Sequence, residues 1–225
     1  MQKKEISIHI DDFPREIHEF FRGAKVYDSS SSKEMRVLYS DLGYYVKIGG
    51  KGLLKKEADM TRLFGQRGMG VEVAAYLSGD QDYLVTRCAR GEDALHGLGD
   101  PERLCRSLAE AMRHLHASSI EGVPVSPCME LYARMGKANC LKQDTFIHGD
   151  FCLPNIMLDD GRLSSFIDVG MAGVGDRHID IYWALWSLDY NLGTDRYADC
   201  FLEYYGKERV DKGILKIVAE VEAMA

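Results

Sequence analysis

The sequence predicts an α+β protein in which a small antiparallel β-sheet with one helix precedes a mainly helical part. Short runs of β-branched and aromatic residues fill the first 90 or so positions, and one helical stripe of apolar residues interrupts them. The long helical patterns all lie beyond residue 100. A chain of 225 residues can bury a substantial core, as one large domain or as two small lobes. We place the joint within residues 89–93, so that the parts are 1–90 and 91–225.

The predicted strands of the first part are separated by turn residues. They lie at 24–29, 35–40, 44–49, 71–78 and 82–89. The last two are expected to pair as a hairpin across Gly79–Gln81. A helix is predicted over 53–64, where an apolar stripe is followed by the sequence Arg-Gly-Met-Gly as a stop.

The second part begins with a helix over 101–117, since Asp100 is a good cap and Pro101 suits the first turn. A short helix is expected near 129–138. The run from Ile156 to Phe166 predicts two strands joined by an Asp-Asp-Gly turn. Further helical segments are predicted at 177–192, 195–205 and 211–224.

Composition excludes several classes of protein. No apolar run approaches the roughly 20 residues that span a bilayer, and the N-terminal residues do not form a signal peptide. Six scattered cysteines without a CxxC pair argue against zinc and against a disulfide framework. A net charge of −7 argues against nucleic acid and favours a cationic ligand. We therefore expect a reduced, cytoplasmic protein without a membrane partner.

The stretch His-Gly-Asp-Phe-Cys-Leu-Pro-Asn, at 148–155, carries the functional signal. Phosphoryl transfer needs a carboxylate to accept the proton of the attacking hydroxyl, oxygen ligands for Mg²⁺ and a cation on the phosphates. Asp150 can supply the acid and Asn155 an amide oxygen from the same loop. Asp168 follows the predicted hairpin and returns beside that loop, so Asn155 and Asp168 can share a metal.

Each of these residues also has a purely structural explanation when taken singly. Asp150 can cap a helix, Asn155 can form an Asx turn and Asp168 can end a strand. Their combination, with the spacing of a hairpin between them, favours the catalytic interpretation.

The first part offers the cation. Tyr45 and Lys47 lie two residues apart on one predicted strand, so both side chains point to the same face. Glu57 follows on the predicted helix and can pair with Lys47, holding the ammonium for phosphates. Tyr45 can stack on a base. The alternatives are a solvated edge-strand lysine and a solvated glutamate.

Residues 148–170 and 175–185 together closely resemble the aminoglycoside 3′-phosphotransferases, which have the protein-kinase-like fold. The resemblance is densest over 146–190, and it extends more weakly over most of the chain. It implies a nucleotide-binding lobe at 1–90 and a catalytic, substrate-binding lobe at 91–225. Choline, homoserine and sugar kinases share the same motifs, so these specify the acceptor less well than the chemistry.

The resemblance implies a role for each matching residue. Asp150 is the expected catalytic base, Asn155 and Asp168 the Mg²⁺ ligands, and Lys47 the contact to the nucleotide phosphates, paired with Glu57.

Other expected roles are structural or concern the base. Tyr45 is expected to stack on adenine, with the backbone of Arg87 and Ala89 at the edge of that base. The resemblance also implies that Asp180 braces the catalytic loop from a buried helix and that His148 shapes this loop.

The region that would bind the acceptor departs from the family pattern. Only 31 residues lie between His116 and His148, so most of the family's acidic insert is absent, and Met171 stands where the family carries arginine. We expect the acceptor site to use aromatic and acidic side chains, namely Trp186, Tyr190, Glu220 and Glu222. Such a pocket suits a smaller acceptor with a quaternary or single ammonium. The alternative is that Trp183 or Trp186 belongs to the core and that the glutamates form a solvated helix end.

The sequence therefore predicts transfer of the γ-phosphate of ATP, or of GTP, to a hydroxyl group of a small cationic molecule. The first expectation is an aminoglycoside of the kanamycin type, with antibiotic resistance as the consequence. A choline, amino-sugar or homoserine kinase is the alternative, followed by a nucleotide-binding pseudokinase-like regulator. A P-loop enzyme is not supported because no Walker A sequence is present. We expect a monomer or a homodimer.

Overall fold

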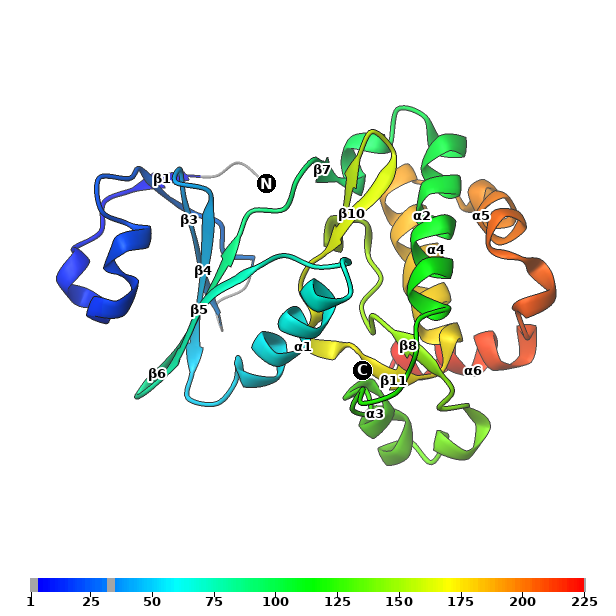
Figure 1. Cartoon of the computed structure of the whole chain (residues 1–225). Helices are drawn as coiled ribbons and strands as arrows, with labels where there is room; N and C mark the ends of the chain where they lie inside the picture. Colours follow the sequence, from blue (N-terminus) through cyan, green and yellow to red (C-terminus); the bar gives the residue numbers. More distant parts are fainter. Residues whose placement is uncertain (1–3, 32–34, 225) are drawn as a thin grey trace. The chain divides into compact units, whose positions relative to one another are not determined.

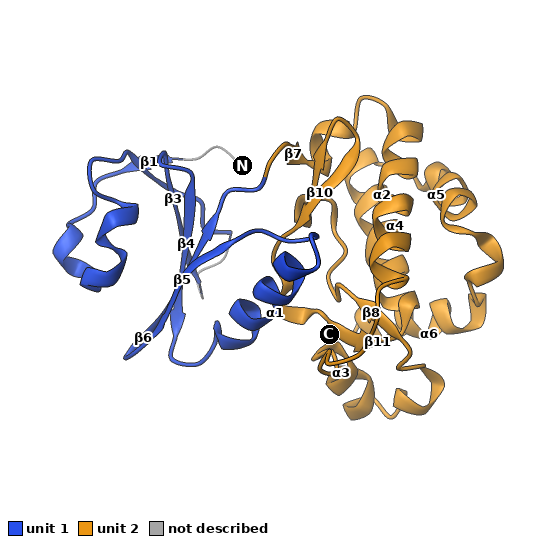
Figure 2. Ribbon diagram, viewed as in Figure 1, with its two compact units in different colours: residues 1–89 blue, residues 90–225 orange. Residues whose placement is uncertain are grey.

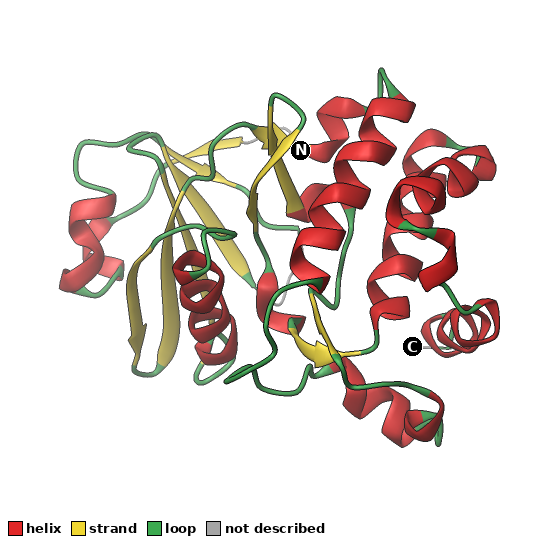
Figure 3. Ribbon diagram, turned by 45° about the vertical axis from the view of Figure 1, so that its right-hand side comes forward, coloured by secondary structure: helices red, strands yellow, loops and turns green. Residues whose placement is uncertain are grey.

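The computed structural model describes residues 4–31 and 35–224, and Figure 1 shows their helices and strands. The chain divides into two units, Met1–Ala89 and Arg90–Ala225 (Figure 2). Strands predominate over helices in the first unit and helices over strands in the second, as Figure 3 shows. The α+β class predicted from the sequence is confirmed. Among the described residues, no helix is both long and apolar enough to cross a membrane.

The first unit contains a six-stranded sheet in the order β1-β2-β3-β4-β6-β5 (Figure 1). All neighbouring strands are antiparallel. The strands are β1 Lys4–Ile6, β2 Val26–Asp28, β3 Arg36–Ser40, β4 Tyr44–Gly50, β5 Val73–Ser78 and β6 Gln81–Arg87. The predicted hairpin is therefore formed by β5 and β6.

The two faces of this sheet are covered by different elements. Buried Val46 and Val85 pack in a cluster with phenylalanines from the 3-10 helices Ile10–Asp12 and Arg15–Phe20 and their flanks. Leu84 packs on the other face, against Ala58 of helix α1 (Lys55–Gln66). Since side chains alternate along a strand, Lys47, which is in register with Leu84, lies on the α1 face.

The second unit is built on five α-helices within its described residues: α2 Pro101–His116, α3 Cys128–Arg134, α4 Arg177–Leu192, α5 Ala198–Tyr205 and α6 Lys212–Glu222. Two small sheets, β10-β9-β7 and β11-β8, accompany them. Their strands are β7 Glu92–Asp93, β8 Thr145–Ile147, β9 Ile156–Asp159, β10 Arg162–Phe166 and β11 Gly173–Gly175. Short 3-10 helices complete the unit at Ala94–Gly97, Ala138–Cys140, Leu153–Asn155, Val169–Met171, Asp195–Tyr197 and Lys207–Arg209.

Helices with strong local start and stop signals follow the predicted limits. The Asp100 side chain accepts from Arg103 N (3.2 Å) at the start of α2. Helix α4 begins after Asp176 and ends at Leu192, before Gly193, whose φ of +65° suits a glycine. The helix predicted near 129–138 ends earlier, at Arg134, because the chain turns at Gly136 with φ +67°. The predicted segment 195–205 opens with a 3-10 turn before α5.

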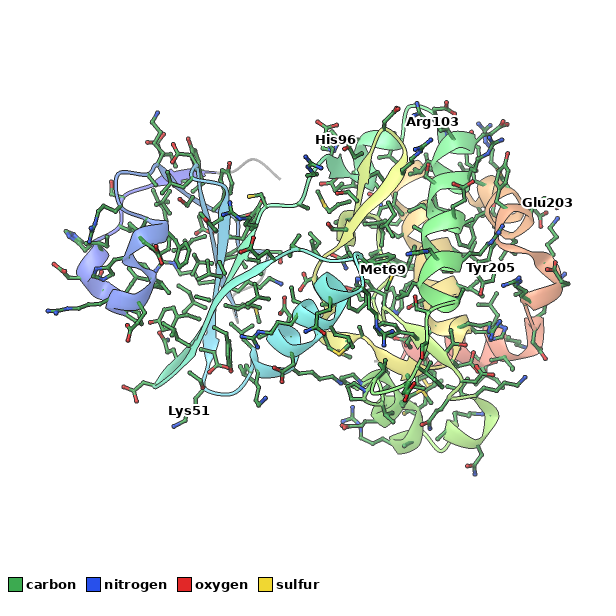
Figure 4. The ribbon with its side chains drawn as sticks, in the orientation of Figure 1. Lys51, Met69, His96, Arg103, Glu203 and Tyr205 are labelled. Carbon is green, nitrogen blue, oxygen red and sulfur yellow. The ribbon has the colours of Figure 1, made fainter. Side chains whose placement is uncertain are left out.

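Side chains tie the helices to the rest of the second unit. Arg103 reaches the turn between β9 and β10, where its guanidinium bonds the carboxylate (2.9 Å) and backbone oxygen (3.1 Å) of Asp160 (Figure 4). Tyr205 of α5 is buried, and its hydroxyl lies 2.9 Å from Nδ1 of His116 on α2. These contacts fix α2 and α5 around the segments that carry the site.

Candidate active site

Lys47 and Glu57 meet in the first unit. Their side chains come from β4 and from the first turn of α1, and Nζ lies 2.5 Å from Oε1. The side chains are only 18% and 10% exposed, so water screens this ion pair much less than a surface pair. The pair predicted from the sequence therefore holds the ammonium group in a defined, mostly buried position.

Tyr45 shares the face of β4 that carries Lys47. Its ring packs against the ring of Tyr39 on the neighbouring strand, with 5.2 Å between ring centroids. The ring is thus supported on one side by the sheet, as a stacking surface for a base requires.

Arg87 and Ala89 follow at the end of β6. The backbone N–H of Arg87 donates to Glu72 O (3.0 Å), and its guanidinium bonds the Glu72 carboxylate at 2.9 Å. The guanidinium also lies over the ring of Tyr44, 5.0 Å from its centroid. The side chain of Arg87 and its backbone N–H are therefore both engaged within the first unit. Ala89 is the last residue of the first unit.

The His148–Asp150 loop of the second unit is held by Asp180 of α4. One carboxylate oxygen accepts from His148 N and the other from Gly149 N, both at 2.8 Å. Asp180 is fully buried, and His116 Nε2 lies 3.0 Å from it. Both backbone groups thus have a charged partner, which makes the geometry of the loop rigid.

Gly149 is required by the geometry of this loop. Its φ is +82°, a value that favours glycine. An added Cβ would lie 2.4 Å from Met171 O and 3.0 Å from Cys128 Sγ. The loop can therefore approach the segment around Met171 only because residue 149 has no side chain.

Asp150 and Asn155 are joined directly. The Asn155 side-chain amide donates to Asp150 O (3.0 Å) and to Asp150 Oδ2 (2.9 Å). Asn155 is buried and Asp150 half-buried. Because the NH₂ group faces Asp150, the amide oxygen is the end of the Asn155 side chain left to bind a cation.

Asp168 is carried back to the loop by the β9–β10 hairpin. Ile167 N donates to Asn155 O (3.0 Å), and Ile167 O lies 3.0 Å from His148 Nε2. Asp168 itself is exposed and has left-handed backbone angles, φ +60° and ψ +42°. The segment that carries Asp168 is thus tied to both ends of the loop.

His148 has its two ring nitrogens occupied. Nδ1 accepts from Asp150 N (3.3 Å), so the proton resides on Nε2 and is donated to Ile167 O. This arrangement leaves no ring nitrogen for a substrate and fits a residue that shapes the loop.

The oxygen ligands at this site fit Mg²⁺. An amide oxygen from Asn155 and a carboxylate from Asp168 are hard ligands, of the kind that Mg²⁺ takes together with water and substrate phosphates. Over residues 4–31 and 35–224, no cluster of three or more His, Cys, Asp or Glu side chains could hold a metal. The set at 155 and 168 therefore suits an ion shared with a ligand rather than a metal held by protein alone.

A cavity of about 730 Å³ opens beside Asp150 in the second unit. Its lining residues come from the α3 region, the loop, α4 and α6: Pro127, Cys128, Leu131, Arg134, Met135, Gly149, Asp150, Met171, Trp183 and Glu222. Asp150 and Glu222 are the acidic members, and Arg134 is the basic one. Most of the remaining wall is apolar, so the cavity can bind a hydroxylated molecule with limited positive charge.

Glu222 is held in this wall by Tyr132. The buried Tyr132 hydroxyl donates to Glu222 Oε1 at 2.5 Å. Burial raises the pKa of Glu222, the charge of Asp150 raises it further, and the hydrogen bond from Tyr132 opposes them. Burial also raises the pKa of Tyr132, which therefore stays protonated and remains a donor.

The other residues predicted for the acceptor lie outside the lining of this cavity. Trp186 and Tyr190 are exposed on α4, and Glu220 is exposed on α6, 4.0 Å from Lys216 Nζ. The structure thus brings only Glu222 of this set to the cavity that contains Asp150.

Sequence reasoning missed Tyr132 and Arg134 of α3. Tyr132 meets a residue 90 positions away in the chain, and no local pattern marks such a contact. The sequence left open whether Trp183 belongs to the core or to the acceptor site. Its side chain is half-buried and also lines the cavity.

Comparison with known proteins gives the family. A family model described as "Phosphotransferase enzyme family" matches residues 127–214. A probable aminoglycoside 3′-phosphotransferase of Lactococcus lactis subsp. lactis is 39% identical, and the match covers 96% of both chains. The chain belongs to the aminoglycoside 3′-phosphotransferase family. This phosphotransferase is also 28% identical to the aminoglycoside 3′-phosphotransferase of Streptomyces fradiae, over 87% of its own chain and 89% of that protein.

Solved structures share the fold of this phosphotransferase. An aminoglycoside 3′-phosphotransferase of type VIII has a TM-score of 0.72 at 21% identity, with 96% of this chain and 99% of that chain covered. An aminoglycoside phosphotransferase of Streptomyces rimosus, in complex with ADP and streptomycin, has a TM-score of 0.68 at 20% identity, with 83% and 89% covered. The predicted kinase-like fold is confirmed.

Proposed function

We propose that this phosphotransferase transfers the γ-phosphate of ATP to a hydroxyl group of an aminoglycoside, with the kanamycin type as the first candidate and Mg²⁺ as the cofactor. The observation that carries the proposal is the Asp150 carboxylate, held by the Asn155 amide, at the wall of the cavity that Glu222 also lines. Two similar proteins support the proposal. The Lactococcus relative is a probable aminoglycoside 3′-phosphotransferase, and the similar Streptomyces rimosus structure is a complex with ADP and streptomycin.

Asp150 is the proposed catalytic base. Its carboxylate would orient the acceptor hydroxyl and take its proton as the phosphoryl group moves. The Asn155 amide holds that carboxylate in place. Glu222 would attract an ammonium group of the acceptor, and Arg134 would limit how many cationic groups the cavity accepts.

Asn155 and Asp168 are the proposed ligands of Mg²⁺. When bound, the ion would neutralise charge on the phosphates of the nucleotide. Their two segments are joined by the bond from Ile167 N to Asn155 O, which keeps the ligand pair together.

The first lobe, residues 1–90, is proposed to bind the nucleotide. Lys47 would contact the phosphates, kept in position by Glu57. Tyr45 would stack on the base, and the backbone of Arg87 and Ala89 would meet its edge. Residues 91–225 would carry the chemistry and bind the acceptor. We expect the enzyme to act in the cytoplasm and to confer antibiotic resistance.

A substrate panel tests the proposal. The purified protein is incubated with ATP or GTP, with and without Mg²⁺, and with kanamycin, choline, glucosamine or homoserine. Phosphorus NMR and mass spectrometry identify the product and the hydroxyl group that is modified. We expect Mg²⁺-dependent phosphorylation of kanamycin that is lost in Asp150→Ala and retained in Asp159→Ala, which changes an exposed carboxylate at the end of β9.

Two results would contradict the proposal. Phosphorylation of choline, glucosamine or homoserine but not of kanamycin would assign the other kinase classes. Nucleotide binding that needs no Mg²⁺, with no product from any acceptor, would favour a binding protein that regulates a partner.

A further inference from the structure

The connection between β4 and α1, residues 51–54, is held by a carboxylate from another strand (Figure 1). Asp82 lies on β6 and is fully buried. Its Oδ1 accepts a hydrogen bond from Gly52 N and its Oδ2 accepts one from Leu54 N, both at 2.9 Å. The backbone at the start of α1 therefore depends on a side chain that lies 30 and 28 positions further along the chain.

Two hydroxyl groups of β5 complete the surroundings of this carboxylate. Ser78 Oγ donates to Oδ1 (2.7 Å), and the Tyr76 hydroxyl donates to Oδ2 (3.0 Å). Burial raises the pKa of Asp82, but the hydrogen bonds from the two backbone groups and the two hydroxyl groups outweigh it and lower the pKa below its ordinary 3.8. Asp82 is therefore ionised at neutral pH, with one backbone donor and one hydroxyl donor on each oxygen.

Helix α1 begins at a residue that cannot cap it. Leu54 stands at the N-cap position, and a leucine side chain has no atom that accepts a hydrogen bond. Leu54 O accepts from Ala58 N (2.9 Å), so the residue whose N–H is bound by Asp82 also closes the first turn of the helix. The negative charge of Asp82 is favourable at this end of the helix dipole. Asp82 thus takes the place of a local cap and fixes where α1 starts.

Glu57 lies in this first turn of α1 and pairs with Lys47. Lys47 is in register with Leu84 of β6, and Asp82 lies two residues before Leu84 on the same strand. Asp82 and Lys47 therefore face α1 from the same side of the sheet. A shift of the first turn of α1 would move the Glu57 carboxylate, and with it the ammonium group that this carboxylate holds.

We propose that Asp82 is a positioning residue for the phosphates of the nucleotide. This inference rests on the function proposed above, because it takes Lys47 as the phosphate contact. Asp82 holds the backbone of Gly52 and Leu54, which fixes the start of α1. The first turn of α1 then presents Glu57, which holds Lys47. Asp82 acts only through this ion pair and does not itself contact the nucleotide.

Kinetics separate this role from a merely structural one. Asp82→Asn keeps the size of the side chain but replaces one acceptor oxygen by an NH₂ group, which cannot accept from a backbone N–H. KM for ATP should rise about tenfold, because the ammonium group is displaced rather than removed, while KM for kanamycin should stay within about twofold. Loss of folded protein alone would lower kcat and leave both KM values unchanged. Asp80→Asn, at an exposed carboxylate just before β6, is the control and should change neither.

A double variant tests the route through Glu57. In Glu57→Gln the ion pair is already weakened, so adding Asp82→Asn should raise KM for ATP by less than about twofold. Calorimetric titration with MgATP, in the absence of an acceptor, should show the same pattern in Kd. An unchanged KM and Kd for ATP in Asp82→Asn would overturn the proposal. Equal effects of Asp82→Asn with and without Glu57 would also overturn it.

Hydrogen–deuterium exchange gives a measurement that needs no turnover. The amide protons of Gly52 and Leu54 should exchange slowly in the unmodified protein, because both are donated to a buried carboxylate. Exchange in peptides that cover residues 52–58 should become faster in Asp82→Asn and stay unchanged in Asp80→Asn. Fast exchange of both amides in the unmodified protein would overturn the proposal, even if Asp82→Asn did not fold.

Failure of this inference can be distinguished from failure of the proposed function. If kanamycin is phosphorylated but KM for ATP does not respond to Asp82→Asn, the positioning role is refuted and the proposed function stands. If no acceptor is phosphorylated, but Asp82→Asn raises Kd for MgATP and loses this effect in Glu57→Gln, the positioning role stands and the proposed function fails.

Discussion

The side-chain amide of Asn155 donates hydrogen bonds to both the backbone oxygen and the carboxylate of Asp150, at 3.0 and 2.9 Å. These two hydrogen bonds therefore hold the proposed base and a proposed metal ligand in fixed positions relative to each other. The NH₂ group fixes where the base points, and the same contact decides that the amide oxygen faces away from Asp150. A change at residue 155 should disturb proton transfer and Mg²⁺ binding together.

Asn155→Ala is predicted to lower kcat at least about 100-fold, because misplacing a catalytic group by even ~1 Å can cost that much. The Mg²⁺ concentration needed for half-maximal rate should also rise. Steady-state rates over a Mg²⁺ series measure both. Asn139→Ala, at an exposed amide of the same unit, is the control. A variant at 155 that keeps its rate within a few-fold would remove the base-positioning role.

Lys47 and Glu57 are predicted to act as a pair. Lys47→Ala should lower kcat/KM for ATP by about two orders of magnitude, because the phosphates lose a positioned cation. Glu57→Gln should cost less, and the double variant should be little worse than Lys47→Ala, since Glu57 works through Lys47.

The same helix provides a control for this pair. Lys55 and Asp59 form an exposed ion pair on α1 at 2.7 Å. Lys55→Ala should leave the ATP kinetics unchanged. Fully additive effects of Lys47→Ala and Glu57→Gln would show that the ion pair has no functional coupling.

The raised pKa of Glu222 predicts how acceptor binding depends on pH. Its ordinary value is 4.5, and burial with the charge of Asp150 raises it. The carboxyl group therefore takes up its proton earlier as the pH falls, above 4.5, and loses its attraction for a cation. KM for kanamycin should therefore rise as the pH falls. In Glu222→Gln, this rise of KM at acidic pH, the acidic limb of the profile, should be smaller.

Tyr132 gives this prediction a second test. Its hydrogen bond lowers the pKa of Glu222 against the effect of burial. Tyr132→Phe should therefore raise that pKa further and move the acidic limb to higher pH. Glu220→Gln, at an exposed carboxylate of the same helix, should move nothing. An unchanged limb in Tyr132→Phe would mean that the hydrogen bond does not tune Glu222.

Local chemistry explains which features the sequence could predict. Helix α4 has an aspartate cap at Asp176 and a glycine stop at Gly193, and its limits were predicted to the residue. The loop at 148–155 and the hairpin behind it are contiguous in sequence, so their hydrogen bonds follow from spacing. Lys47 and Glu57 lie ten residues apart on adjacent elements, and their contact could also be predicted.

Long-range packing decided the features that the sequence could not predict. The Tyr132–Glu222 bond joins α3 to α6, and the position of Arg134 at the cavity depends on how α3 lies beside the loop. Glu220 and Glu222 look equivalent in the sequence. Two residues apart on a helix they face different directions, and only Glu222 turns toward the cavity.

Asp176 predicts the acid sensitivity of the fold. Its carboxylate accepts from Lys142 N (2.7 Å), His178 N (2.9 Å) and His178 Nδ1 (2.6 Å). His178 Nε2 accepts from Asp211 N (2.8 Å), so the proton of this ring lies on Nδ1 and is donated to Asp176. Asp176 thus joins the start of α4 to the segment before β8 and, through His178, to the start of α6.

The pKa of Asp176 fixes the direction of this effect. Burial alone would raise the pKa, but the hydrogen bonds from His178 and Lys142 outweigh it and lower the pKa below its ordinary 3.8. An aspartate with a lowered folded pKa stabilises the fold above the unfolded value. That contribution is lost as the pH falls below 3.8 and through the folded pKa.

Asp176→Asn is predicted to lower the free energy of unfolding at neutral pH by about 2 kcal/mol, because an amide donor would replace an acceptor beside an N–H group. Its stability should also vary less than that of the unmodified protein below about pH 4. Thermal unfolding followed by circular dichroism over an acidic pH series measures both. Asp189→Asn, at an exposed position on α4, should follow the unmodified protein. If the stability of Asp176→Asn and of the unmodified protein changed with pH in parallel, the acid sensitivity would come from other carboxylates. A carboxylate makes the two curves diverge only if its pKa differs between the folded and unfolded protein.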